Sequence, residues 1–439
     1  MVRDIRVERV RHLDDRYHIA RACERVAVVV LGDVGRSPRT VYHALALADA
    51  GIVVDLVGNA DTPLEPAAAR HPRIVLHVLR TPASAAPGVR FVARAAWRAV
   101  RQSIELLALL RRLPPPDALL VQNPPAVPTL LIAWLVARAR GARLIVDWHN
   151  FGYAMLTVRL PRSHPAVRLA RAYERAVGRL ADHHLCVSRA MADTLAVDLG
   201  VQGVIVLHDR PAARFAPADA AGRAALRARF AAELGLPPLD REAAWVVSPT
   251  GWTPDEDLAL LIDAVARCDA ALASGRAANP DVILILTGEG PLRAQWTERL
   301  ARLELRRVHV RAHWLAADDY PRLLAAADLG VSVHRSTSGC DLPMKIADLH
   351  GAGVPVCALD YGPCLSEMLI ASEEPWRFGT AEGLSSHLLR LLEGFPDGAT
   401  ELDAARAALA AAPVERWSDA WKALVAPLFV CEPARDVRA

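Results

Sequence analysis

The segment "DVILILTGEGP" (residues 281–291) decides the fold class, because a continuous apolar run leads into a glycine-rich turn. A strand that is apolar on both faces is typical of a parallel sheet covered by helices on each side. Comparable runs alternate with helical stretches along the whole chain. They lie at 25–32, 51–58, 73–79, 118–122, 142–148, 184–188, 203–208, 243–250, 281–288, 307–310, 328–334 and 354–359. We therefore expect an α/β protein with doubly wound, Rossmann-like sheets.

The domain organisation follows from length and from one break in this alternation. A chain of 439 residues exceeds the ~250–300 residues that one core usually serves. The segment 208–215 ("HDRPAARF") is the predicted hinge between an N-terminal domain at 1–210 and a C-terminal domain at 211–412. In the remaining segment, 413–439, Trp417 and Trp421 share one helical face. They are expected to pack either across the first domain or on their own domain.

Cysteine usage and hydropathy restrict the compartment. The seven cysteines are odd in number and form no Cys-x-x-Cys pair, which favours a reducing compartment over a disulfide framework. The first 25 residues are too charged for a signal peptide. The longest apolar run, at 126–137, is shorter than the ~18 residues that a membrane-spanning helix needs. We expect a cytoplasmic protein without a membrane anchor.

Positive charge is concentrated in one part of the chain. Residues 80–179 contain sixteen arginines and four acidic residues. Within them, the segment 91–110 reads as an amphipathic helix, with an apolar face that includes Trp97 and a basic face. The basic face carries Arg94, Arg98 and Arg101. We rank contact with an anionic membrane surface first, a solvated face second and nucleic acid third, since no nucleic-acid motif accompanies the charge.

The segment "DLPMKIADLHGAGVPVCA" (341–358) holds one of only two lysines among 52 basic residues. Pro343 suits a helix start, which places Lys345 in the first turn, where free N–H groups already favour an anion. Asp348 lies three residues on and shares the face of Lys345. We predict that Lys345 binds a diphosphate and Asp348 a ribose. An exposed ion pair is the alternative.

Two further loops are expected at the same sheet edge. Gly288 and Gly290 follow a strand and allow backbone N–H groups to approach a phosphate. Asp255 and Asp257, in "SPTGWTPDEDL" (248–258), match the Asp-x-Asp pattern of metal-dependent sugar transferases. We favour helix-start chemistry there, with Thr253 as N-cap and Pro254 after it, and therefore predict no metal. 

Polar residues also follow two strands of the first domain. The loop "GDVGRSPR" (32–39) is not a dinucleotide fingerprint, but it supplies Asp33 and Arg36 before a helix. In "DWHNFGY" (147–153), His149 is the best general-base candidate by residue type, although a lone histidine is often structural. Asp33 is the second candidate base.

The chain resembles the chitobiosyldiphosphodolichol β-mannosyltransferases, GDP-mannose-dependent enzymes that add the first mannose to a lipid-linked glycan. The segments that carry the resemblance span about residues 25–425. They include "LGDVGRSPRTVYHALALADAG", "VQNPPAVPTL", "LIVDWHNFGYAM", "YERAVGRLADHHLCVSRAM", "TGWTPDEDLALLIDA", "TGEGPLR", "STSGCDLPMKIADLHGAGVPVCAL" and "RWSDAW". The resemblance implies a GT-B architecture, inversion at the anomeric carbon and no metal or other cofactor. Eukaryotic members begin with a membrane anchor, which is not expected here, and "ASEEPWRFGT" lacks an expected glycine loop.

The resemblance also implies roles for individual residues. The donor, GDP-mannose, is expected to contact Lys345, Asp348, Gly288, Glu289, Gly290, Ser338, Gly339, Asp341, Thr250 and Trp252. The acceptor, a polyprenyl-pyrophosphate-linked sugar, is expected to contact Gly32, Gly35, Arg36, Asn150 and Tyr153, next to His149 and Asp33. The protein is expected to work peripherally on the cytoplasmic face of a membrane. Three alternatives remain: another nucleotide-sugar donor, a nucleotide-sugar 2-epimerase, and a non-catalytic partner in glycan assembly.

Overall fold

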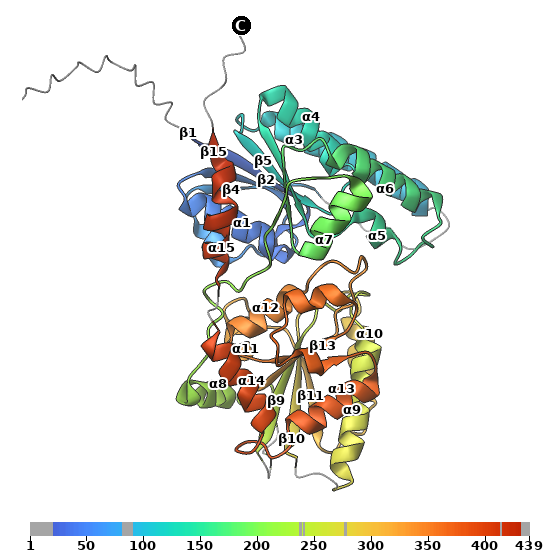
Figure 1. The fold of residues 1–439 in the computed structure, drawn as a ribbon, viewed down its shortest axis with the longest axis vertical. Coiled ribbons are helices and arrows are strands. Elements are labelled where there is room, and N and C mark those ends of the chain that lie inside the picture. Colours follow the sequence, from blue (N-terminus) through green and yellow to red (C-terminus); the bar gives the residue numbers. More distant parts are fainter. Residues whose placement is uncertain are drawn as a thin grey trace, which may run out of the picture.

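The structure is a computed structural model that describes residues 21–80, 91–236, 239, 242–275, 279–412 and 415–431. Two parallel sheets, each with helices on both faces, form two domains that lie end to end (Figure 1). This confirms the predicted doubly wound α/β architecture.

The first domain contains a seven-stranded sheet in the order β4-β3-β2-β5-β6-β7-β8, with parallel neighbours throughout. Its strands are β2 (Arg25–Asp33), β3 (Val53–Asn59), β4 (Ile74–Val78), β5 (Ala118–Asn123), β6 (Arg143–Trp148), β7 (His183–Cys186) and β8 (Val204–Val206). Its helices are η1 (Val34–Arg36), α1 (Pro38–Asp49), α2 (Pro66–Arg70), α3 (Phe91–Arg112), α4 (Thr129–Arg140), α5 (Gly152–Leu156), α6 (Pro165–Gly178), α7 (Arg189–Thr194) and η2 (Leu195–Leu199).

The second domain contains a six-stranded parallel sheet in the order β11-β10-β9-β12-β13-β14. Its strands are β9 (Ala243–Pro249), β10 (Asp281–Thr287), β11 (Val308–His313), β12 (Leu329–Ser332), β13 (Val356–Leu359) and β14 (Arg377–Phe378). Its helices are α8 (Ala220–Glu233), α9 (Leu258–Ala273), α10 (Arg293–Ala301), α11 (Asp319–Ala326), α12 (Met344–Gly351), η3 (Pro363–Glu367), η4 (Glu374–Trp376), α13 (Ala381–Leu391) and α14 (Thr400–Ala411).

Continuous apolar strands give each sheet two buried faces. All seven residues of β9 are buried, and Val246 and Val247 belong to cores on opposite faces of the sheet. In β2, Val28 and Val29 likewise point into separate cores. The carboxyl ends of the central strands therefore carry loops that meet between the domains, the place where doubly wound folds bind ligands.

The last helix, α15 (Trp417–Leu424), returns to the first domain and lies beside α1 (Figure 1). Trp417 and Trp421 are buried in the core that covers one face of the first sheet. The helix is followed by η5 (Ala426–Phe429) and by β15 (Val430–Cys431), which pairs antiparallel with β1 (Arg21–Ala22). Of the two packing alternatives for the indoles, the structure has the one across the first domain.

Of two predictions about local structure, one is wrong and the other is confirmed as far as the structure describes it. Thr253 is not an N-cap, because α9 begins at Leu258 and Asp257 caps it by accepting from the Leu260 N–H at 3.1 Å. The predicted amphipathic helix is present as α3, but the side chains of Arg94, Trp97 and Arg98 lie outside the described residues. Within the described part of the chain, no helix is long and apolar enough to cross a membrane.

Candidate functional site

A cavity of about 490 Å³ lies between the two domains, and we call it the Lys345 cavity. From the first domain it is lined by residues of the η1 and α2 regions, and from the second by the ends of β9 and β10, the turn before α11, and α12. Among the predicted site residues, its lining includes Gly35, Arg36, Thr250, Gly288, Glu289 and Lys345. Segments that are far apart in sequence therefore form one interdomain cavity.

Lys345 lies in the first turn of α12, and its ammonium is paired with the carboxylate of Glu256. Glu256 is buried, and it also accepts hydrogen bonds from the Thr250 hydroxyl and from the Gly251 N–H at 2.9 Å. Burial acts to raise the pKa of Glu256, but the Lys345 ammonium and these donors hold that pKa below its usual range. The cavity thus contains a fixed ammonium at a helix N-terminus.

Asp348 faces a different set of groups from Lys345. Its Oδ2 accepts from the Tyr320 hydroxyl at 3.4 Å, and Tyr320 lines the Lys345 cavity. Burial raises the pKa of Asp348 from its ordinary value of 3.8 to about 7, although the Arg214 guanidinium opposes this. Near neutral pH, the protonated form of Asp348, which can donate a hydrogen bond, and the ionised form, which only accepts, are consequently both populated.

The loop that contains Gly288 and Gly290 packs closely against the loop that contains Thr250 and Gly251. A Cβ on Gly288, whose φ is +103°, would collide with the Thr250 carbonyl oxygen, and one on Gly290 would collide with that of Gly251. Trp252, which is expected to contact the donor, has a fully buried side chain and does not line the Lys345 cavity. Its indole N–H donates to the Gly288 carbonyl at 3.0 Å, and this hydrogen bond holds the glycine loop in place.

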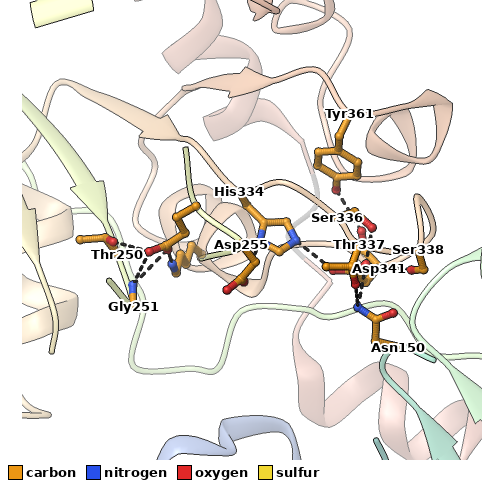
Figure 2. A network of polar contacts seen from close by, with 12 residues as sticks. Asn150, Thr250, Gly251, Asp255, His334, Ser336, Thr337, Ser338, Asp341 and Tyr361 are labelled. Carbon is orange, nitrogen blue, oxygen red and sulfur yellow. Dashed lines mark hydrogen bonds and ion pairs between the residues drawn. The ribbon is translucent and has the colours of Figure 1, made fainter. Parts of the chain in front are cut away.

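Asp341 is at the centre of a second polar cluster, which joins the domains (Figure 2). Its carboxylate accepts from the hydroxyls of Ser336 and Ser338 and shares a 2.9 Å hydrogen bond with His334. Asn150 of the first domain donates to the same carboxylate at 3.1 Å. Burial acts to raise the pKa of Asp341, yet the His334 contact and the hydroxyls keep it below the usual range.

This second cluster separates two groups of predicted donor residues. Ser338, Gly339 and Asp341 do not line the Lys345 cavity. Asp341 instead lines another cavity, of about 460 Å³, together with Asn150 and residues of α5 and the segment that follows it. Conversely, Gly35 and Arg36, which were assigned to the acceptor, line the Lys345 cavity, and the Arg36 guanidinium donates to the Glu289 carbonyl at 2.6 Å.

His149 follows β6 and belongs to a buried polar network whose protonation pattern can be deduced. The Trp421 indole N–H, which can only donate, gives its hydrogen bond to His43 Nδ1 at 3.0 Å. His43 must then carry its proton on Nε2, which faces Asp147 Oδ2 at 3.1 Å. Asp147 is held as a carboxylate by the bidentate Arg39 guanidinium at 2.8 and 2.9 Å. His149 Nε2, 2.7 Å from the same oxygen, must therefore be an N–H donor, which leaves Nδ1 as the free basic nitrogen.

The charges of this network are consistent with that pattern. Burial acts to raise the pKa of Asp147, but the Arg39 and His149 side chains hold it well below its usual range. Burial lowers the pKa of His43, so this ring stays neutral. Arg39 also donates to Asp209 at 2.8 Å, and both partners are buried. A buried carboxylate thus orients the half-buried ring of His149, whose side chain is 21% exposed.

Asp33, the other candidate base, caps η1. Its Oδ1 accepts from the N–H groups of Gly35 at 3.3 Å and Thr62 at 3.2 Å. Its Oδ2 is buried and has no hydrogen-bond partner among the described residues. A buried carboxylate oxygen without a partner is costly unless a ligand satisfies it, and Asp33 Oδ2 can accept a hydrogen bond from a hydroxyl group.

The Asp-x-Asp pattern does not form a metal-binding cluster. Asp257 pairs with Arg335 at 2.6 Å, and Asp255 lies 3.6 Å from His334. In the described residues, no three side chains from His, Cys, Asp and Glu are placed to hold a metal ion.

Sequence analysis missed several important residues. Glu256 was interpreted as part of a helix start, although it lies only five residues after Gly251, from whose N–H it accepts. Arg39 and His43, one turn apart in α1, were not considered, and neither was Trp314, which lines the Lys345 cavity with half its surface exposed. These three become significant only through contacts across more than a hundred residues or through the shape of the cavity.

Two family models and several curated relatives match this chain. Residues 34–209 match the family model described as Glycosyl transferase 4-like domain, and residues 245–394 match Glycosyl transferases group 1. Human chitobiosyldiphosphodolichol beta-mannosyltransferase is 35% identical over 94% of each chain. The protein named UDP-glycosyltransferase TURAN, from Arabidopsis thaliana, is 36% identical over 92% of this chain and 97% of its own.

The chain belongs to the chitobiosyldiphosphodolichol beta-mannosyltransferase family.

Solved structures support the same fold. Sucrose-phosphate synthase from Thermosynechococcus elongatus has a TM-score of 0.64 at 15% identity and covers 91% of this chain and 97% of its own. HepE of Anabaena, solved with UDP and glucose, has a TM-score of 0.62 at 17% identity, with 91% and 98% coverage. The GT-B architecture expected from the resemblance is thus confirmed. As a member of this mannosyltransferase family, the protein is a glycosyltransferase.

Proposed function

We propose that this protein is an inverting mannosyltransferase that moves mannose from GDP-mannose to a polyprenyl-diphosphate-linked GlcNAc acceptor. The observation that carries the proposal is the Lys345 cavity, an interdomain site with a fixed ammonium, in a chain that is 35% identical to a human enzyme of that name.

The donor occupies the Lys345 cavity in this proposal. Lys345 and the first N–H groups of α12 bind the diphosphate, and they neutralise the charge that develops on the leaving GDP. Trp314 offers an exposed aromatic face for the nucleobase. Tyr320, which lines the cavity, and its partner Asp348, which is not among the lining residues, serve the ribose hydroxyls. The residues supply this stabilisation without a metal ion, so turnover should survive EDTA.

The acceptor hydroxyl is activated from the first domain. His149 Nδ1 takes the proton of that hydroxyl, because Nε2 is engaged with Asp147. The acceptor oxygen forms its bond to the anomeric carbon while the bond from that carbon to the diphosphate oxygen breaks. Attack opposite the leaving group inverts the anomeric configuration. Asp33, whose Oδ2 has no partner among the described residues, accepts a hydrogen bond from the sugar or serves as the second candidate base.

The lipid part of the acceptor places the protein at a membrane surface. In α3, the exposed residues include Val100, Ile104 and Arg101, and Arg111 and Arg112 are exposed at its C-terminal end. Exposed apolar side chains between arginines suit peripheral contact with anionic lipid on the cytoplasmic face.

A different donor is the second candidate, favoured by the name of the 36% identical Arabidopsis relative, which specifies UDP. The test is a panel of GDP- and UDP-sugars with a short-chain GlcNAc2-diphosphate lipid, with and without EDTA. We expect transfer from GDP-mannose in both conditions. Transfer from a UDP-sugar alone would change the donor, interconversion without acceptor would indicate a 2-epimerase, and binding without turnover a non-catalytic partner.

A further inference from the structure

A third cavity, of about 380 Å³, lies on the other side of α5 from the 460 Å³ cavity, and we call it the Arg162 chamber. Its walls are α5, the first turns of α6, the junction of α7 with η2, and the Thr337–Ser338 turn of the second domain. It shares no lining residue with the Lys345 cavity. The donor site and the Arg162 chamber are therefore separate spaces.

The chamber adjoins the loop that carries the candidate base, and two of its walls are tied to that loop by hydrogen bonds. Asn150, the residue after His149, donates to the Thr337 hydroxyl at 3.1 Å. The buried carboxylate of Glu174, on α6, accepts from the Gly152 N–H at 2.8 Å and so ties α6 to the N-terminus of α5. The hydrogen bonds of Asn150 and Gly152 therefore join the loop after His149 to two walls of the chamber, the Thr337 turn and α6.

Positive charge dominates the chamber. Three guanidinium groups line it, from Arg162, Arg168 and Arg171, against a single carboxylate, Asp198, which pairs with Arg171 at 2.9 Å. Arg162 and Arg168 are exposed, and in the described part of the chain neither makes an ion pair. Arginine binds phosphate oxygens through two parallel N–H donors, so this arrangement suits a doubly charged phosphate group.

Tyr153 adds a neutral donor to the same space. Its ring stacks on Phe151 at 5.3 Å between centroids and lies 5.7 Å from the Arg171 guanidinium carbon. Burial raises the pKa of Tyr153 to about 12, so its phenol keeps its proton at neutral pH. The hydroxyl can therefore donate to an anion without adding negative charge to the chamber.

Apolar surface next to the arginines indicates what the anion is attached to. Leu169, adjacent to Arg168, is 73% exposed. Met155, on α5, and Val158, just after it, line the 460 Å³ cavity and are each 50% exposed. A free nucleotide or inorganic anion would not need this surface, whereas a phosphorylated lipid would cover it.

We propose that Arg162, Arg168 and Arg171 bind the diphosphate that joins the acceptor sugar to its lipid, with the first isoprene units on the apolar surface around α5. The inference rests on the proposed function, and it assigns the acceptor's diphosphate to residues on α6 and the segment before it.

A direct binding measurement tests this without turnover. Farnesyl diphosphate is titrated calorimetrically into the full chain with saturating GDP, which blocks the Lys345 cavity. We expect the double variant Arg162→Ala/Arg168→Ala to weaken binding at least 10-fold, and Arg162→Lys/Arg168→Lys to recover part of it. Arg267→Ala, at an exposed position on α9, is the matched control and should bind like the wild type. Equal affinity of the double variant and the control would overturn the proposal.

Kinetics separate this proposal from the proposed function. For the short-chain diphosphate acceptor, the double variant should raise KM at least 10-fold, with an unchanged KM for donor. An alkyl chitobioside, which lacks phosphate, should react equally with wild type and variant. If the variant loses only binding to phosphatidylglycerol vesicles, the arginines bind phospholipid headgroups and the proposal is wrong. Farnesyl diphosphate binding that depends on the arginines, in a protein without transferase activity, would support the chamber and contradict the proposed function instead.

Discussion

The ammonium of Lys345 is paired with the buried carboxylate of Glu256, which lies in the turn before α9. The pair joins the first turn of α12 to the turn before α9, at the edge of the interdomain cavity. A donor diphosphate that enters the cavity must share the ammonium with Glu256. The carboxylate therefore fixes the direction of the ammonium before the donor arrives, which reduces the entropy lost on binding.

Replacement of Lys345 by alanine tests the role of that ammonium. We expect kcat to fall by roughly 10²–10³-fold and GDP to bind more weakly, because a group that neutralises leaving-group charge is lost. Steady-state kinetics and calorimetry with GDP provide the measurements. The chain supplies its own control, since Lys422, on the exposed side of α15, is the other lysine. Near-normal kinetics for Lys345→Ala, like those of Lys422→Ala, would remove the phosphate role.

Replacement of Asp147 by asparagine tests the orientation of His149. An amide in this position can donate to His149 Nε2 and favour the opposite tautomer, with the proton on Nδ1. We expect kcat to fall by about 10³-fold while the KM for donor stays within 2-fold. Single-turnover kinetics distinguish slow chemistry from slow product release. A variant with unchanged kcat would show that His149 is not the base and would move that role to Asp33.

The two indoles of α15 allow a matched comparison. Trp421 donates to His43, whereas the indole nitrogen of Trp417 is buried without a partner among the described residues. Both phenylalanine variants should lose about 1–2 kcal/mol of unfolding free energy through imperfect packing. Only Trp421→Phe should also lower kcat, by about 5-fold, because one hydrogen bond of the network is lost. If Trp417→Phe and Trp421→Phe have the same kcat and the same unfolding free energy, α15 has only a structural role.

Asp348 gives the protein a pH-dependent stability. Its pKa is raised from 3.8 to about 7 in the folded state, so the folded form holds this proton more tightly than the unfolded form does. The contribution is therefore complete at low pH and is lost as pH rises through 7. Between pH 5 and 8, the unfolding free energy of the wild type should fall by roughly 1–3 kcal/mol more than that of Asp348→Asn, as measured by urea unfolding. Parallel pH profiles for wild type and variant would contradict the assignment.

Substitutions on α3 test whether this helix contacts a membrane surface. Glutamate at Arg101, Arg111 and Arg112 should lower co-sedimentation with vesicles of phosphatidylcholine and phosphatidylglycerol, since each exposed arginine contributes up to about 1 kcal/mol. Transfer to a short-chain, water-soluble acceptor should be unaffected. Unchanged sedimentation would refute membrane contact through this helix.

The fold was predictable because its signal is local: each apolar strand is continuous in sequence, and alternation with helices specifies a parallel sheet. The strand β14, with two residues, has no such signal. Lys345 was predictable because lysine is rare in this chain. Its partner Glu256 was not, since three consecutive acids before a helix are also ordinary capping chemistry. The network of Arg39, His43 and Trp421 depends on contacts between α1, β6 and α15, which no local pattern specifies.

The anomeric configuration of the product tests the central claim most directly. The purified protein is incubated with GDP-mannose and a short-chain GlcNAc2-diphosphate lipid, and the new linkage is analysed by NMR. The account predicts a single β-linked mannose on the terminal GlcNAc. An α-linked mannose, or no transfer from GDP-mannose under conditions where the protein is folded and binds GDP, would contradict it.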